Sequence, residues 1–175
     1  MTLATYLLDA VTVGVVLISV YTDLKQRKIY NKVIATGIVA GLMLHALTSG
    51  TAGIIFSLKG LGAGLGLLFV PFALGGFGAG DVKLMGAVGA LKGPYFAFNA
   101  FLATGITGGI FAIAVLIKQK RLLSTLKRIA LTFLVFIGSR FRINTLKSLD
   151  KAEYHESLPY GLAIGIGTFV AYLMR

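Results

Sequence analysis

Long apolar stretches separated by short polar or basic ones make up most of the chain. Residues 3–21 form a nearly uninterrupted apolar run, and TDLKQRKIYNK follows it directly. A helix needs about 20 apolar residues to cross a bilayer, so the pattern predicts a bundle of membrane helices. About six spans are expected, at residues 3–21, 33–48, 51–74, 82–91, 95–117 and 158–174.

Two of the apolar segments are short for a membrane crossing. Residues 82–91 would be about 15 Å long as a helix, which predicts a short or partly re-entrant crossing. Residues 129–137 have basic residues on both sides, so both flanks favour the same leaflet. We expect residues 129–137 to form an amphipathic helix on the cytoplasmic surface, with a tilted span as the alternative.

The composition excludes a water-soluble globular domain. Of the 175 residues, 57% are hydrophobic and 13% are charged, and the mean hydropathy is +0.87. So much apolar surface cannot be hidden inside a domain of this size. The prediction is an all-α, polytopic membrane helix bundle, in which residues 1–175 form a single integral-membrane domain surrounded by lipid.

The net charge of +11 is explained by where the basic residues lie. They cluster between the apolar segments, at residues 25–32 and 118–151, as the positive-inside rule expects of cytoplasmic loops. Both termini are then outside, and the chain is a multi-pass protein of the cell inner (cytoplasmic) membrane. Because no nucleic-acid-binding module accompanies the basic clusters, we expect no nucleic-acid partner.

Carboxylates are scarce, and their positions matter for that reason. There are six: Asp9, Asp23, Asp81, Asp150, Glu153 and Glu156. An ionisable group near a membrane span is a functional candidate by default. The predicted topology brings Asp23 and Asp81 to the same leaflet, whereas Asp9 lies about 21 Å from Asp23 along a helix. Two facing carboxylates share one proton, and such a pair can activate water and polarise a peptide carbonyl.

Each of these two aspartates also has a structural interpretation. Asp23 could form an ion pair with Lys25 or Arg27, beside the end of the first helix. Asp81 could be the N-cap of the helix that follows it. Asn31 is likewise placed to cap the second predicted helix. The residues by themselves leave these alternatives open.

Glycines crowd the sequence just before Asp81, in GGFGAGDVK at residues 75–83. Their density is unfavourable inside a helix and predicts a bend at which a substrate backbone can approach. Gly80 is expected to have a positive φ and to allow a close backbone approach, both of which a β-branched residue would block. A second group suggests the small-residue spacing of closely packed membrane helices: Gly62, Gly64 and Gly66.

Three motifs together resemble those of the type IV prepilin peptidases, a family of intramembrane aspartyl proteases. GAGDVK at 78–83 matches the G-x-G-D signature, and DLKQRKIYN at 23–31 resembles the first-aspartate motif, which continues to Ile-Pro-Asn. LPYGLAIGIG at 158–167 resembles the Pro-Phe-Gly-Pro motif that opens the family's last helix. Three positions depart from the usual motif residues without removing an aspartate: Tyr30, Tyr160 and Leu162.

The resemblance implies an aspartic endopeptidase in which Asp23 and Asp81 are catalytic. Its substrate would be the leader of a type IV prepilin or pseudopilin, cut at the cytoplasmic membrane face. Other motif residues are assigned to substrate binding: Gly78, Gly80, Lys83, Arg27, Asn31, Pro159 and Gly161. We expect no methyltransferase domain, as in the short, peptidase-only form of Tad/Flp pilus systems, and no metal or cofactor.

Other polar positions are given no catalytic role. His45 is expected to pack near the outer end of the second predicted helix, and Glu153, His155 and Glu156 to form a solvated loop rather than a metal site. The alternative functions are a small proton-coupled transporter or channel subunit and a structural assembly subunit. A proton relay would place acids at successive depths, whereas the two key aspartates are expected at one leaflet.

Overall fold

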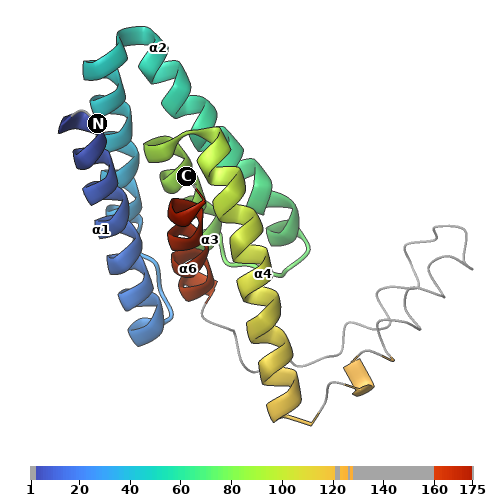
Figure 1. Ribbon diagram of the computed structural model, residues 1–175. Coiled ribbons are helices and arrows are strands. Elements are labelled where there is room, and N and C mark those ends of the chain that lie inside the picture. Colours follow the sequence, from blue (N-terminus) through green and yellow to red (C-terminus); the bar gives the residue numbers. More distant parts are fainter. Residues whose placement is uncertain (1–2, 121–122, 126, 128–159, 175) are drawn as a thin grey trace, which may run out of the picture. The chain divides into compact units, whose positions relative to one another are not determined.

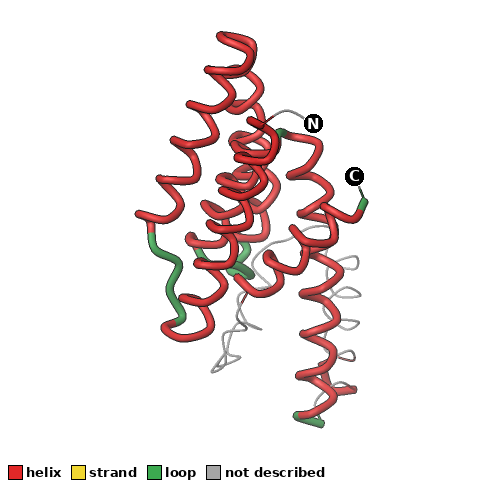
Figure 2. The backbone as a smooth tube through the Cα atoms, turned by 60° about the vertical axis from the view of Figure 1, so that its left-hand side comes forward, coloured by secondary structure: helices red, strands yellow, loops and turns green. Residues whose placement is uncertain are grey.

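The computed structural model describes residues 3–120, 123–125, 127 and 160–174 (Figure 1). This part of the chain contains no β-strand, which confirms the predicted all-α fold. Its main helices are α1 (Leu3–Gln26), α2 (Asn31–Ala73), α3 (Ala79–Lys92), α4 (Pro94–Lys118) and α6 (Tyr160–Leu173). Figure 2 shows that short loops join α1 to α2 and α2 to α3. Because α1, α2 and α4 are long and apolar enough to cross a membrane, the chain is a membrane protein.

The chain forms two compact units, one of residues 1–108 with 159–175 and the other of residues 109–158. The first unit contains α1, α2, α3, the first part of α4, and α6, and it holds both Asp23 and Asp81. The second unit contains the rest of α4. The amphipathic helix predicted at 129–137 lies outside the described residues, and so does Pro159.

The predicted spans 33–48 and 51–74 are the two halves of α2. At Gly50 the backbone leaves the helical region, with φ 57° and ψ −135°, and the chain reverses direction there (Figure 1). A positive φ is easily adopted by glycine, which has no Cβ. The predicted boundary between the two spans is therefore confirmed, and a single glycine makes the reversal.

α3 is buried along nearly its whole length, because both halves of α2 approach it through glycines. A Cβ added to Gly41 would lie 2.9 Å from the Ala90 carbonyl oxygen, and one added to Gly60 would lie 1.9 Å from that of Gly89. Gly64 approaches Met85 in the same way, at 2.3 Å. The 14 residues of α3 measure about 21 Å as a helix, less than a bilayer's hydrocarbon core, so α3 is a short internal helix.

The glycines that pack are not all those expected. Gly64 meets α3, but a Cβ at Gly62 or Gly66 would have no neighbour within 4 Å. Successive residues of a helix are about 100° apart, so residues two apart lie on nearly opposite faces and residues four apart share one. The packed pair is therefore Gly60 and Gly64, and the prediction for Gly62 and Gly66 is wrong.

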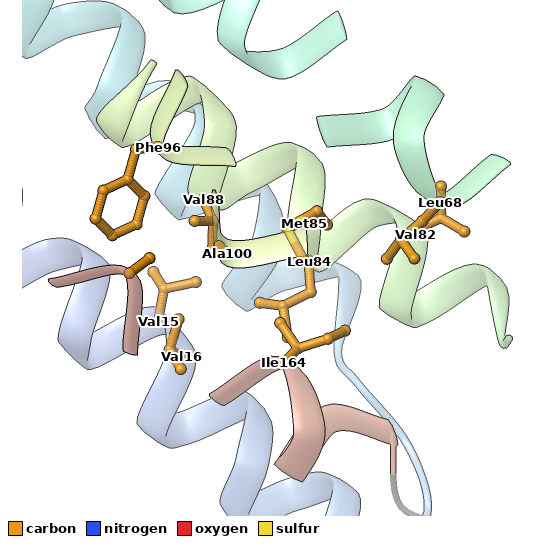
Figure 3. Close-up of a cluster of buried hydrophobic side chains, with 11 residues drawn as sticks. Val15, Val16, Leu68, Val82, Leu84, Met85, Val88, Phe96, Ala100 and Ile164 are labelled. Atoms are coloured by element: carbon orange, nitrogen blue, oxygen red, sulfur yellow. The ribbon is translucent and has the colours of Figure 1, made fainter. Parts of the chain in front are cut away.

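A cluster of apolar side chains fills the space among α1, α3, α4 and α6 (Figure 3). Val15 and Val16 come from α1, Leu84 and Val88 from α3, and Ile164 from α6, and all are buried. Phe96 and Ala100 of α4 also belong to it, and so does Leu68 of α2. Because lipid is as apolar as these side chains, their packing stabilises the bundle through van der Waals contact. The cluster holds α1, α3 and α6 against one another, so their ends lie together.

Candidate active site

Asp23 lies in the last turn of α1, on the face that the bundle buries. The helix ends shortly after it, because Arg27 adopts a left-handed φ of 53°. The Arg27 N–H donates to the Asp23 carbonyl oxygen at 2.8 Å and closes the last turn. The end of α1 therefore holds a carboxylate that is only 9% exposed.

The N-terminus of α6 binds the Asp23 carboxylate. The Gly161 N–H donates to Oδ2 of Asp23 at 2.9 Å. A Cβ at position 161 would lie 2.7 Å from that oxygen, a separation that real Cβ atoms do not show, so only glycine allows this hydrogen bond. The first N–H groups of a helix have no partner within the helix and favour a negative charge. Gly161, which was predicted to bind substrate, lies directly against one of the two aspartates.

Asp81 lies in the first turn of α3 and is buried there. Its Oδ2 accepts a hydrogen bond of 2.9 Å from the N–H of Gly78, the residue that precedes the helix. The predicted N-cap role for Asp81 is therefore wrong in position, because the helix begins at Ala79, two residues earlier. Asp81 acts instead from the third helical position, as the acidic member of a capping box does.

Asp23 lies close enough to Asp81 for its charge to influence the ionisation of Asp81. α3 is not among the three helices long enough to cross a membrane, and Asp81 lies in its first turn. Burial, the largest cause, raises the pKa of Asp81 to about 6. The Gly78 hydrogen bond lowers that pKa, and the charge of Asp23 raises it. Asp81 therefore holds a proton more readily than an ordinary aspartate does.

The glycine-rich loop before α3 reaches the start of α6. The Phe77 and Tyr160 rings lie 4.5 Å apart between centroids, tilted by 39°. Each ring directly precedes a glycine whose N–H binds one of the aspartates, Gly78 in one case and Gly161 in the other. This contact was not foreseen, because Tyr160 stood out in the sequence only as a departure from a motif.

The predicted bend at GGFGAG is present, but not at every glycine. Gly75 has a φ of 80°, within the turn that follows α2. Gly80 is helical and has no positive φ, so that part of the prediction is wrong. Gly80 is instead a position of close approach, where an added Cβ would lie 3.2 Å from Cβ of Ile29.

Two further predicted residues contact each other beside this site. The Lys83 ammonium donates to the side-chain oxygen of Asn31 at 3.1 Å, linking the start of α3 to the start of α2. Asn31 is therefore not the predicted helix cap: Tyr30 occupies the N-cap position, and no side chain caps the helix there. Lys25 was one of the two residues considered as an ion-pair partner of Asp23. Its ammonium hydrogen-bonds the Tyr21 hydroxyl at 3.4 Å.

The remaining polar residues fall into three cases. His45 packs as expected, with its Nε2 3.0 Å from the Leu91 carbonyl oxygen and its ring edge-on to Phe56. Asp9 lies away from Asp23 and forms an ion pair with Lys92 of α3, which lies just beyond the predicted span 82–91. The cluster of Glu153, His155 and Glu156 lies outside the described residues.

Buried carboxylates in this arrangement are suited to acid–base chemistry. They come from different helices, and a backbone N–H fixes one oxygen of each. A pair that shares one proton provides a base and an acid at the same point. Such a pair can remove a proton from water while it donates another to a carbonyl oxygen.

A comparison with known proteins gives one match. The family model described as "Type IV leader peptidase family" matches residues 10–113. That range includes Asp23 and Asp81 but not Gly161, so the contact made by α6 is a separate observation. No curated protein and no solved structure matches the chain.

Proposed function

We propose that this chain, which belongs to the type IV leader peptidase family, is an aspartic endopeptidase that uses Asp23 and Asp81 to remove prepilin or pseudopilin leaders. Membership makes it a membrane peptidase. The observation that carries the aspartic mechanism is the approach of two buried carboxylates from α1 and α3. The chain contains no cysteine that could act as a nucleophile.

The asymmetry of the pair supports a division of roles. Asp81, whose pKa is raised, would hold the shared proton, and Asp23 would act as the base. Asp23 takes a proton from water as the water oxygen attacks the scissile carbonyl carbon, and Asp81 gives its proton to the carbonyl oxygen. Asp23 then passes its proton to the departing amide nitrogen while Asp81 recovers one from the new hydroxyl, which breaks the C–N bond and restores both groups.

The substrate proposal follows from the position of the pair at the ends of helices. A helix hides its peptide bonds in internal hydrogen bonds, so a prepilin leader would be cut where its apolar helix leaves the membrane and unwinds. The glycine-rich loop of residues 75–78 would let that backbone approach. Lys83, Asn31 and Arg27 lie at the same end and are proposed to contact the leader.

The proposed orientation places this end at the cytoplasmic face of the inner membrane. The basic residues between α1 and α2 support it, since basic loops stay inside and anionic lipid headgroups attract them. The chain would then be multi-pass, with the prepilin sharing its bilayer.

The direct test is cleavage of a co-expressed type IV prepilin by Asp23→Asn and Asp81→Asn variants. Each substitution keeps the side chain's size but removes its ability to exchange a proton, so we expect cleavage to fall by at least roughly 10²-fold. Immunoblotting of the prepilin measures cleavage, and the membrane level of each variant shows that it is inserted. Lys59→Met, at an exposed lysine of α2, is the control. Near-normal processing by either aspartate variant would overturn the proposed mechanism.

A further inference from the structure

α1 and α3 carry the two carboxylates, and the N-terminus of α6 binds one of them. These three helices also meet in a second polar cluster at their other ends. Asp9 of α1 forms an ion pair with Lys92 of α3. The Tyr172 hydroxyl of α6 donates to the same Asp9 oxygen at 3.1 Å. The Lys92 ammonium also lies 5.0 Å from the centre of the Tyr172 ring. These three residues are called the Asp9 cluster.

Spacing along each helix separates this cluster from the catalytic pair. Asp9 lies 14 positions before Asp23 on α1, about 21 Å at 1.5 Å per residue. Lys92 lies 11 positions after Asp81 on α3, and Tyr172 the same number after Gly161 on α6, each about 17 Å. At the end away from the catalytic pair, each of the three helices is therefore tied to the other two.

The charged groups of the Asp9 cluster are largely shielded from water, so they can be stable only in positions where they contact each other. The Lys92 side chain is 5% exposed and that of Asp9 is 26% exposed. An unpaired charge in such surroundings is costly. Phe96 adds a second aromatic ring, 5.5 Å from the ammonium. The ammonium is thus restricted to one position by a carboxylate and two rings.

Hydrogen bonds fix α3 against α2: the Ser57 hydroxyl donates to the Ala90 carbonyl oxygen at 2.8 Å, and the Lys83 ammonium donates to Asn31. Against α1 and α6, α3 packs through apolar side chains such as Leu84 and Val88. Apolar contacts of this kind are less selective for one axial register than a hydrogen-bonded ion pair is. The Asp9 cluster adds a polar contact that joins α3 to both of these helices.

We infer that the Asp9 cluster is a positioning device: it sets the register of α3 against α1 and α6 and thereby holds Asp81 opposite Asp23. The inference rests on the proposed function for its catalytic consequence. The three residues act through the aspartates and do not touch the substrate. A shift of about 1 Å in α3 is enough to lower turnover on the order of 10²-fold.

The first test measures turnover per folded enzyme for Lys92→Met and for the double variant Asp9→Leu/Lys92→Met. Lys92→Met leaves Asp9 without its cation and is expected to lose both stability and kcat. The double variant leaves no unpaired charge, so its thermal stability in detergent should return toward wild type. Its kcat should nevertheless remain at least roughly tenfold low, with KM little changed. Full recovery of kcat with stability would show that the cluster only neutralises charge and would overturn the inference.

Two further variants measure how much of the loss in kcat is specific to the ion pair between Lys92 and Asp9: Tyr172→Phe and Lys59→Met. Tyr172→Phe removes one hydrogen bond but keeps the ion pair and the ring, so its kcat should fall less than that of Lys92→Met. Lys59→Met makes the same substitution at an exposed lysine and should leave kcat unchanged. An equal loss in Lys59→Met would contradict a specific role for Lys92.

A second test needs no substrate. Because the chain has no cysteine, Leu24→Cys on α1 and Ala79→Cys on α3, both exposed positions, can carry a pair of spin labels. The distance between them should shift or broaden in Lys92→Met and in the double variant, but not in Lys59→Met. An unchanged distance would overturn the register argument, whereas a wild-type enzyme that cleaves no prepilin would overturn only the proposed function.

Discussion

At one end of α1, α3 and α6, two carboxylates lie together, and at the other a carboxylate meets an ammonium. Asp23 and Asp81 repel each other when both are ionised, and burial alone would disfavour either charge. Asp9 and Lys92 satisfy each other, and Tyr172 adds a hydrogen bond. Packing against the same apolar cluster therefore supports two electrostatic arrangements of opposite character.

The difference separates what stabilises the bundle from what performs chemistry. Opposite charges in contact need no further explanation in a folded protein. Two like charges brought close together raise the free energy of the ionised pair, and such a cost is typical of functional sites. The end with Asp23 and Asp81 is therefore where activity is expected, and the end with Asp9 and Lys92 is where geometry is fixed.

Glycines show the same division. At the end with Asp23 and Asp81, Gly161 lets a backbone N–H reach the carboxylate of Asp23. Toward the other end, Gly60 and Gly89 let two helix backbones touch. The absence of a side chain serves an ionisable group in the first case and helix packing in the second.

The largest effect that would test this comparison is expected from Gly161→Ala. The added methyl would lie 2.7 Å from Oδ2 of Asp23, so the carboxylate must move and lose its N–H donor. We expect prepilin turnover per folded enzyme to fall on the order of 10²-fold, with a smaller change in melting temperature. Gly66→Ala, where nothing lies within 4 Å of the added methyl, is the matched control. If turnover merely followed the folded fraction, Gly161 would be a packing residue like Gly60.

Gly60→Ala should show the converse behaviour. Its methyl would meet the backbone of Gly89, with no flexible side chain to move aside, so the helices must separate. We expect a loss of about 3 kcal/mol in stability, measured by thermal melting in detergent, with activity falling only as the folded fraction falls. Gly62→Ala, two positions away and facing open space, should be neutral or stabilising by up to about 1 kcal/mol. Equal melting temperatures for the two variants would contradict the packing assigned to Gly60.

The smallest expected effect is a dependence of stability on pH, caused by Asp81. The pKa of Asp81 is raised from 3.8 to about 6 in the folded protein, so the folded state binds a proton more tightly than the unfolded chain. The resulting stabilisation is complete below pH 3.8 and is lost as the pH rises through about 6. Melting temperature should fall over this range by a few degrees more in wild type than in Asp81→Asn. Parallel curves for the two proteins would show that Asp81 is not perturbed.

The sequence by itself determined the helices and the meeting of the two aspartates. Apolar runs of membrane length specify where helices form, and the gap between residues 48 and 51 marked the reversal at Gly50. Because successive helices alternate in direction, counting them was enough to predict that Asp23 and Asp81 share one end. The spacing of the motifs also pointed to peptidase chemistry.

Only the tertiary structure decided which residues surround those aspartates. Gly161 lies 138 positions from Asp23, and Lys92 lies 83 positions from Asp9, and no pattern along the chain relates residues so far apart. Hydrophobic periodicity specifies the face that a helix buries, but the register between two helices depends on side chains that interlock in three dimensions. For that reason Asn31 proved to be a partner of Lys83 rather than a helix cap. Lys92, which the apolar pattern leaves between two predicted spans, proved to be a buried cation.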